Sequence, residues 1–233
     1  MTQGTLYVVA TPIGNLEDIT LRALRVLKEV GLVACEDTRR TRTLLTHFGI
    51  HARVTSYFEH NKMTKGTAII RALTEGTSVA LVTDAGTPGI SDPGFLLVRE
   101  AREAGIPVVP VPGPSAVVAA LSAAGVPADR FVFDGFLPVK SGKRIHRLEA
   151  LRELGMTLVC YESPHRILAT LEAIGQVFGE FEIVAARELT KQFEEIARGT
   201  PSALLQRFST APVRGEFTLV IPYTKRPCPS PRP

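Results

Sequence analysis

The 233-residue chain has no tryptophan, and only 6% of its residues are aromatic. This scarcity weakens the case for nucleic-acid recognition through platforms of stacked aromatic rings. The three cysteines, Cys35, Cys160 and Cys228, are odd in number and far apart, so they indicate neither a disulfide framework nor zinc-ligand spacing. The five histidines form no His-x-x-x-His pair. We therefore expect no metal site.

Several well-known ligand-binding motifs are also missing. The loop after the first predicted strand contains one glycine, at position 14, where a dinucleotide fold would carry Gly-x-Gly-x-x-Gly. A mononucleotide P-loop and a Gly-x-Ser-x-Gly nucleophile elbow are absent as well. The longest apolar region, residues 108–124, is interrupted by prolines, and the N-terminus leads directly into a strand. These patterns predict a cytoplasmic protein with no membrane span and no signal peptide.

The composition is typical of a globular protein with a substantial core. Hydrophobic residues make up 45% of the chain and charged residues 21%. The net charge is +4 and the isoelectric point is near 9.1. This mildly basic balance permits a nucleic acid or another anionic partner without requiring one.

The first half of the chain alternates strands and helices. Apolar runs predict strands at residues 6–10, 32–35, 79–82 and 108–111, and a weaker signal predicts one near 53–56. Periodic apolar positions predict helices between them, at residues 19–30, 38–48, 65–75 and 95–104, the first with Asp18 as its N-cap. Repeated strand–helix–strand units connect by right-handed crossovers, so we expect a parallel sheet.

The second half has a different pattern. Strands are predicted at 131–133, 157–161, 183–186 and 217–221, with a further segment at 193–198 and helices at 142–154, 166–178 and 202–208. The chain lacks a full crossover helix after residue 187, which favours mixed or antiparallel pairing. We expect two lobes, 1–114 and 115–224, followed by a mobile proline-rich tail, 225–233.

The most informative segment is the loop at residues 83–94, which follows a buried strand. It contains three glycines, two prolines and two aspartates. Glycines let a ligand approach the backbone, and prolines make an open loop rigid. Because open α/β sheets bind ligands at the carboxyl ends of their strands, this loop is a candidate ligand site, although an ordinary strand-to-helix connection is the alternative.

Three further groups of residues lie at strand ends or helix starts. Glu36 and Asp37 precede a basic stretch and suit acid–base work, although Asp37 or Thr38 also suits a helix N-cap. Residues 112–116 begin a helix whose free amides can hold an oxygen-rich ligand. The segments 161–166 and 187–191 place dense charge at the ends of apolar strands, where buried charge requires partners.

Seven of these segments, in this order, resemble the small-subunit ribosomal RNA methyltransferase I family of the tetrapyrrole methylase superfamily: residues 8–16, 35–39, 83–94, 112–115, 136–138, 161–166 and 187–191. The match spans residues 5 to about 222. The resemblance implies a two-lobed α/β homodimer with S-adenosylmethionine in the cleft between the lobes. The implied reaction is 2′-O-methylation of a cytidine in the decoding region of 16S ribosomal RNA, within the small subunit.

The resemblance also assigns cofactor contacts. The backbone near Asp84, Ala85, Gly86 and Thr87 would hold the methionine end, and the same pocket would be lined by Gly113, Pro114, Ser115 and Ala116. The adenosine would be bordered by Tyr161 and Ala186. Many family members continue past the last strand with a helical segment where this chain has its proline-rich stretch. If that segment holds RNA, we expect this chain to use other surfaces or to bind RNA more weakly.

A ribose hydroxyl is a poor nucleophile and gains from a base or a polarising group. The candidates are Glu36, Asp37, Glu188 and Lys191, although a lysine would need a depressed pKa. We favour Glu36 and Asp37 because their strand end faces the expected cleft; the alternative role for them is to orient the sugar.

RNA also requires positive surface. Two clusters qualify, although such runs are often simply solvated: Arg39, Arg40 and Arg42; and Lys140, Lys143, Arg144, His146 and Arg147. Replacing Arg39 and Arg40 with alanine is predicted to weaken RNA binding in a salt-dependent way.

Three other functions compete with this reading. A tetrapyrrole methylase is disfavoured because the first loop lacks the Gly-x-Gly-Pro-Gly pattern of those relatives. A non-enzymatic RNA-binding module would keep the fold without binding S-adenosylmethionine. A phosphohydrolase would need clustered metal-binding carboxylates, which the Glu194–Glu195 pair alone does not supply.

Overall fold

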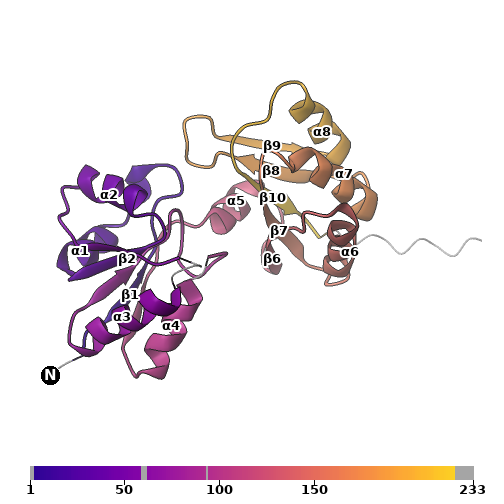
Figure 1. Ribbon diagram of the computed structural model, residues 1–233. Helices are drawn as coiled ribbons and strands as arrows, with labels where there is room; N and C mark the ends of the chain where they lie inside the picture. The colour runs from indigo at the N-terminus through magenta and orange to yellow at the C-terminus, as the bar shows by residue number, and fades with distance from the viewer. Residues whose placement is uncertain (1–2, 59–61, 93, 224–233) are drawn as a thin grey trace, which may run out of the picture. The chain divides into compact units, whose positions relative to one another are not determined.

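The computed structural model describes residues 3–58, 62–92 and 94–223 (Figure 1). The chain divides into two compact units, Met1–Ser115 and Ala116–Pro233, and each contains a five-stranded sheet. The predicted α/β class is confirmed, with a parallel sheet in the first unit and a mixed sheet in the second. The tail predicted at 225–233 lies outside the described residues.

The first unit alternates strands and helices as the apolar pattern predicts. Its elements are β1 (Leu6–Val9), the 3₁₀ helix η1 (Leu16–Asp18), α1 (Leu21–Glu29), β2 (Leu32–Cys35), α2 (Thr38–His47), β3 (Val54–Ser56), α3 (Lys62–Thr74), β4 (Val79–Leu81), α4 (Gly94–Glu103) and β5 (Val108–Val111). The strand order is β3-β2-β4-β1-β5, and all pairs are parallel.

Helices cover both faces of this sheet (Figure 1). α1 and α2 pack on one face, over a core that includes Val9, Val33 and Val82. α3 and α4 pack on the other face, over Leu6 and Leu81 among others. The chain therefore leaves β4 toward the opposite face from its neighbours β1 and β2, and such a reversal is where doubly wound sheets bind ligands.

The second unit begins with an alanine-rich helix and then builds a mixed sheet. Its elements are α5 (Ala116–Ala124), β6 (Phe131–Phe136), α6 (Ser141–Arg152), β7 (Thr157–Glu162), α7 (Ile167–Phe178), β8 (Ile183–Arg187), β9 (Glu195–Gly199), α8 (Pro201–Ser209) and β10 (Phe217–Ile221). The order is β6-β7-β10-β8-β9, in which only β6 and β7 are parallel. The predicted antiparallel pairing near the C-terminus is confirmed.

One face of the second sheet carries the main core, where α6, α7 and α8 pack over residues such as Cys160 and Leu219. α5 lies against β8 and β10. Tyr161 follows Cys160 in β7, and successive side chains of a strand alternate between faces, so Tyr161 points away from the α6–α8 core.

Two local predictions need correction. The N-cap of α1 is Thr20, whose side chain accepts a hydrogen bond from the Ala23 amide, whereas Asp18 lies in the preceding η1. The strand predicted at 131–133 extends to Phe136 because an irregularity in the β6–β7 register lets pairing continue. No helix within the described residues is both long and apolar enough to cross a bilayer.

Candidate functional site

Three loops at the carboxyl ends of neighbouring strands β4, β1 and β5 are tied together by hydrogen bonds. The Thr11 amide donates to the Gly86 carbonyl at 2.9 Å, and the Gly86 amide donates back to Thr11 at 3.0 Å. The buried Thr11 hydroxyl donates to the Thr83 carbonyl at 3.0 Å. The Thr87 hydroxyl donates to the Pro114 carbonyl at 3.2 Å. The predicted ligand loops therefore form one fixed backbone framework.

Glycines make this framework possible at two places. Gly86 has a φ of +86°, a left-handed conformation that side chains disfavour. At Gly113, a Cβ would stand 3.0 Å from the Ala10 Cβ, so any larger residue would require Ala10 or the loop to shift by a few tenths of an ångström. Gly113 is exposed, so backbone rather than a side chain faces a ligand there, whereas Gly86 is buried and fixes the loop through its two hydrogen bonds with Thr11.

The second part of the long loop is organised by Asp92. Its Oδ1 accepts hydrogen bonds from the amides of Gly89 and Gly94, at 2.8 and 2.7 Å. Its Oδ2 is buried and has no hydrogen-bond partner in the described structure. Because an unpaired buried oxygen is costly, this atom is a candidate contact for a polar ligand group. Sequence reasoning did not single out Asp92.

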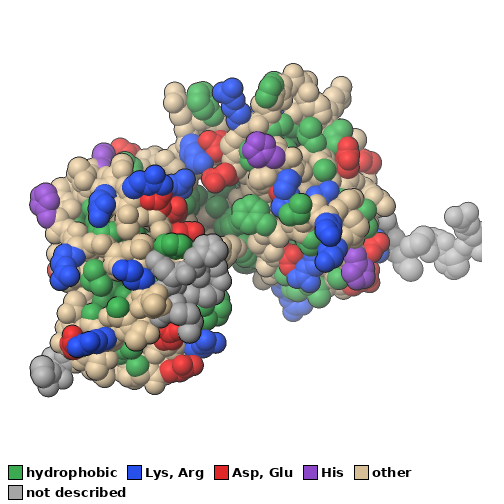
Figure 2. Space-filling view, viewed as in Figure 1, with side chains coloured by type: hydrophobic (Ala, Val, Ile, Leu, Met, Phe, Trp, Pro, Cys, Tyr) green, Lys and Arg blue, Asp and Glu red, His purple; other side chains and the backbone are tan. Residues whose placement is uncertain are grey.

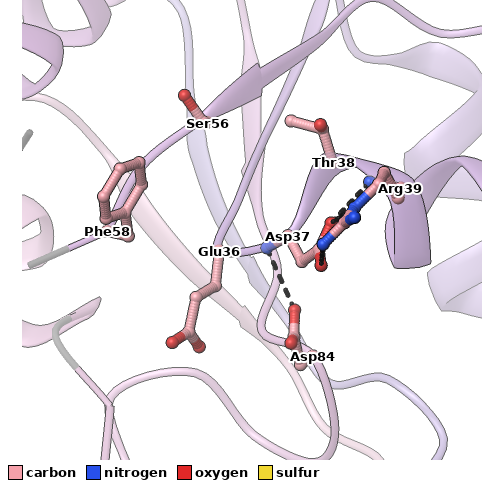
Figure 3. Close-up of a pocket in the computed structure, with 7 residues that line it drawn as sticks. All are labelled: Glu36, Asp37, Thr38, Arg39, Ser56, Phe58 and Asp84. Carbon is pink, nitrogen blue, oxygen red and sulfur yellow. Dashed lines mark hydrogen bonds and ion pairs between the residues drawn. The ribbon is translucent and has the colours of Figure 1, made fainter.

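A cavity of about 470 Å³ lies at the carboxyl ends of β2, β3 and β4 (Figure 3). Two of its residues were not predicted as part of a site: Ser56, which ends β3, and Phe58, two residues later. Figure 3 shows the Glu36 carboxylate extending away from the paired Asp37 and Arg39 side chains. The cavity is lined by Glu36, Asp37, Thr38, Arg39, Ser56, Phe58 and Asp84.

The adjacent carboxylates Glu36 and Asp37 have different environments. The pKa of Glu36 is raised, first by partial desolvation and then by the negative charges of Asp84 and Asp92, while Arg40 opposes the shift. The pKa of Asp37 is lowered by hydrogen bonds from the Arg39 side chain and backbone. When two carboxyl pKa values are pushed apart, the group with the higher value is the better proton acceptor near neutral pH.

Asp37 is the N-cap of α2, as the alternative prediction had it. Its Oδ1 accepts from the Arg39 amide at 2.8 Å. Its own amide donates to Asp84 at 3.1 Å, and Asp84 also forms an ion pair with Arg40 at 3.3 Å. Asp37 therefore holds the strand end in place, and Glu36 is the carboxylate of the pair that forms no hydrogen bond or ion pair with the described residues.

In the second unit, Tyr161 and Ala186 lie on one face of the sheet. Both residues pair with Thr218 of the intervening β10, so they stand in the same row two strands apart. Burial raises the pKa of Tyr161, while a hydrogen bond with the Val117 backbone opposes the shift. Ala186 is buried. The cofactor roles assigned to these two residues stay predictions.

Glu188 and Lys191 form an ion-paired turn after β8. The Lys191 Nζ lies 2.8 Å from Glu188 and 3.0 Å from Glu216. Burial would lower the pKa of Lys191, but these two carboxylates outweigh it and raise the pKa. The pKa of Glu188 is lowered, since the Lys191 ammonium and the Glu216 amide outweigh burial. The structure therefore disfavours both residues as the base.

Two of the residues in this turn are not glycine yet have left-handed backbones. Glu188 has a φ of +51° and Thr190 a φ of +65°. Residues held in such conformations cluster at ligand-binding and switch regions. The turn therefore stays in the candidate site as a fixed charge arrangement.

The predicted RNA-binding residues divide into exposed and buried groups. Arg39, Arg40 and Arg42 are exposed on α2, where Figure 2 shows blue basic side chains close to red acidic ones. Lys140 and Lys143 are exposed at the start of α6. The prediction that Arg144 binds RNA is wrong, because this residue is only 5% exposed and lies in the protein interior.

The burial of Arg144 follows from helical periodicity. Leu148 and Leu151, four and seven positions further along α6, are buried on the same stripe. Its Nε has no hydrogen-bond partner in the described structure. Arg147 forms an ion pair with Asp134 of β6 instead of standing free. Among the described residues, no group of three or more His, Cys, Asp and Glu side chains could hold a metal ion.

Comparisons with solved structures show the same fold in several enzymes. A uroporphyrin-III-C-methyltransferase from Thermus thermophilus aligns with a TM-score of 0.65 at 23% identity, covering 94% of both chains. A cobalt precorrin-4 methyltransferase aligns with a TM-score of 0.71 at 19% identity, covering 96% of both chains. A diphthine synthase aligns with a TM-score of 0.74 at 17% identity, covering 95% of this chain and 91% of that chain. At these identities the likeness concerns the fold alone.

Curated relatives are much more similar in sequence. A protein of Pseudomonas aeruginosa is 57% identical over 88% of this chain and 73% of its own length. A protein of Mesorhizobium japonicum is 53% identical over 94% of this chain and 75% of its own length. Both carry the name ribosomal RNA small subunit methyltransferase I, which confirms the resemblance drawn from the motifs. Residues 5–205 match the family described as Tetrapyrrole (Corrin/Porphyrin) Methylases, and the chain belongs to that family.

Proposed function

We propose that this chain uses S-adenosylmethionine to methylate the 2′-hydroxyl of a cytidine ribose in the decoding region of 16S ribosomal RNA. The proposal includes a homodimeric enzyme that acts in the cytoplasm on the small ribosomal subunit. The observation that carries it is the joined loop framework at Thr11, Gly86 and Pro114, in a chain about half identical to relatives named as ribosomal RNA methyltransferases.

The residues of this framework fit the cofactor. S-adenosylmethionine supplies a methyl group on a positively charged sulfur, which is already activated for transfer. A site for it needs chiefly to align the donor with the acceptor oxygen. In the loops at residues 84–87 and 112–115, Ala85 and Gly113 are exposed and carry little or no side chain, so a ligand can approach their backbone, which suits the amino-acid end of such a molecule. Pro114 and Ser115 belong to the same proposed pocket, and the proposal assigns Ala116, Tyr161 and Ala186 of the second unit to the cofactor.

Glu36 is the residue we assign as proton acceptor. A ribose hydroxyl becomes a better nucleophile as its proton moves to a base, and Glu36 is the free carboxylate of the cavity. Its raised pKa increases its basicity relative to an ordinary carboxyl. Glu36 acts only when ionised, so activity is present above its pKa and is lost as the pH falls through it.

The other charged residues have supporting roles. Asp37 fixes the start of α2, and Lys191 is a cation held by Glu188. Arg39, Arg42 and the exposed lysines of α6 provide positive surface for phosphates.

The test is methyl transfer from labelled S-adenosylmethionine to small subunits that lack the modification, with naked 16S RNA and a precorrin as alternative acceptors. A 2′-O-methyl group protects the adjacent phosphodiester against alkali, so the product is mapped by alkaline hydrolysis. Glu36→Gln is expected to lower kcat by about 10² to 10⁴. Glu149→Gln, at an exposed carboxylate of α6, serves as the matched control.

Three results would contradict the proposal. Methylation of a base would show the wrong acceptor atom, and preference for the precorrin would show the wrong substrate class. Failure to bind S-adenosylmethionine, measured by calorimetry, would favour an RNA-binding module without methyltransferase activity.

A further inference from the structure

The segment 136–138 is one of the seven family-like motifs, and the cofactor and base assignments leave it unused. Phe136 ends β6, an edge strand, and 58% of the residue is exposed to solvent. Its ring lies 5.6 Å, centroid to centroid, from that of Tyr161, which in turn lies 4.8 Å from that of Phe133. An exposed aromatic ring at the end of a row of rings offers an open face to a planar group.

A β-bulge brings these rings together. Phe133 pairs with Val159 and Phe136 with Tyr161, so three steps along β6 match two steps along β7. Side chains alternate along a regular strand, so Phe133 and Phe136 would otherwise point to opposite faces. Gly135, with a φ of +61°, supplies the left-handed residue that such a bulge often requires. The bulge therefore turns Phe136 onto the face that carries Tyr161.

The chain directly after Phe136 is held by a buried ionic network. The Arg166 guanidinium donates to the carbonyls of Leu137 and Pro138. The same group lies 3.3 Å from the carboxylate of Glu162, whose side chain is fully buried. Glu162 also accepts a hydrogen bond from the Thr170 hydroxyl at 2.6 Å. Phe136 is therefore anchored on both sides, by the bulge before it and by this network after it.

Two lysines come shortly after Phe136 in the sequence. Lys140 is four residues beyond Phe136, so their Cα atoms are at most about 14 Å apart. Lys140 and Lys143 are exposed, and neither forms a salt bridge within the described residues. An exposed ring followed by free cations matches the chemistry of an unpaired nucleotide, which has a planar base and an anionic backbone.

We propose that Phe136 is a stacking platform for an unpaired base of the RNA substrate. This inference rests on the proposed function and adds a residue to its substrate contacts. The low aromatic content of the chain excludes a long row of such platforms, but recognition of a single unstacked base requires only one ring. The alternative ligand with a similar face is the adenine of the cofactor, and the experiment below separates the two.

The absence of tryptophan from the chain makes a direct test possible. In Phe136→Trp the new indole is the single tryptophan, and stacking of a base quenches its fluorescence. Phe131→Trp is the matched reporter, because Phe131 is also exposed and lies at the other end of β6. The probes are an unstructured pyrimidine oligoribonucleotide, unmodified small subunits and S-adenosylmethionine alone.

Quenching of Phe136→Trp by RNA, with no response from Phe131→Trp, is the expected result. In methyl transfer, Phe136→Ala and Phe136→Leu are expected to raise KM for RNA by roughly tenfold, while Phe136→Trp keeps the value near wild type. The dissociation constant for S-adenosylmethionine is expected to stay unchanged in all three variants.

Three outcomes would overturn the platform. Quenching by S-adenosylmethionine alone would place the cofactor against the ring. Quenching that follows protein concentration without any ligand would indicate a contact between copies of the chain. Unchanged fluorescence with RNA, in an enzyme that still transfers methyl groups, would reject the platform and leave the proposed function intact. If the wild type methylates no RNA, the proposed function fails. In that case the fluorescence of Phe136→Trp with the oligoribonucleotide decides whether Phe136 contacts RNA: quenching supports the contact and no quenching rejects it.

Discussion

Replacement of Gly86 by alanine is expected to weaken cofactor binding beyond its effect on folding. The Gly86 backbone has a φ of +86°, where a side chain costs about 1–2 kcal/mol. Within the protein an added Cβ would meet Ile13 at 3.6 Å and the Pro114 carbonyl at 3.9 Å, which are ordinary contact distances. Backbone strain therefore accounts for the whole expected loss of folding stability, about 1–2 kcal/mol.

Gly49 provides the matched control for this strain. Its φ is +61°, and a Cβ there would meet no atom within 4 Å. Gly49→Ala should therefore lower the free energy of unfolding by a similar 1–2 kcal/mol. Urea unfolding, followed by circular dichroism, measures both losses.

The two variants should differ in cofactor affinity. If the backbone next to Gly86 contacts S-adenosylmethionine, strain at position 86 displaces that backbone and lowers affinity by at least about tenfold, or 1.4 kcal/mol. Gly49→Ala should bind as the wild type does. Titration calorimetry measures both dissociation constants, and equal affinity in the two variants would refute the assignment of this loop to the cofactor.

Two further predictions concern the cavity and its basic rim. Asp84 raises the pKa of Glu36 and Arg40 lowers it. In the pH profile of kcat/KM, the acid limb should therefore move to lower pH in Asp84→Asn and to higher pH in Arg40→Ala. Shifts of both variants in the same direction would contradict the role of Glu36. Double replacement of Arg39 and Arg42 by alanine, which leaves the Arg40–Asp84 ion pair in place, should weaken RNA binding. It should also flatten the plot of log affinity against log salt by about 0.7 for each lost phosphate contact, without changing cofactor affinity, and an unchanged slope would exclude this surface.

Much of the fold could be predicted because the relevant signals are local. Apolar runs of four or five residues between periodic segments located the strands of the first sheet. The N-cap at Asp37 followed from a side chain that bonds an amide two residues later. The same reasoning misplaced the start of α1, since Asp18 and Thr20 are both good capping residues and only the chain path selects Thr20.

The site was less accessible because its geometry depends on contacts distant in the sequence. Loop position alone suggested Gly86, but its pairing with Thr11 requires β1 and β4 to be neighbours in the sheet. Glu36 and Asp37 looked equivalent. Their pKa values diverge because partial burial, together with the charges of Asp84 and Asp92 in the loop after β4, raises that of Glu36, while Arg39 lowers that of Asp37.

Some errors were avoidable. Arg144 read as surface charge because it lies in a basic run, yet its spacing from two buried leucines already marked it as inward-facing. A charge pattern read together with helical periodicity would have separated Arg144 from Lys140 and Lys143.

The most direct measurement is a crystal structure of the protein grown with saturating S-adenosylmethionine. If the loop at residues 84–87 holds the cofactor, we expect electron density for the methionyl group against the backbone of this loop, with the Thr11–Gly86 hydrogen bonds intact. Density at a place that does not touch this loop, or none at a concentration where calorimetry shows binding, would contradict it.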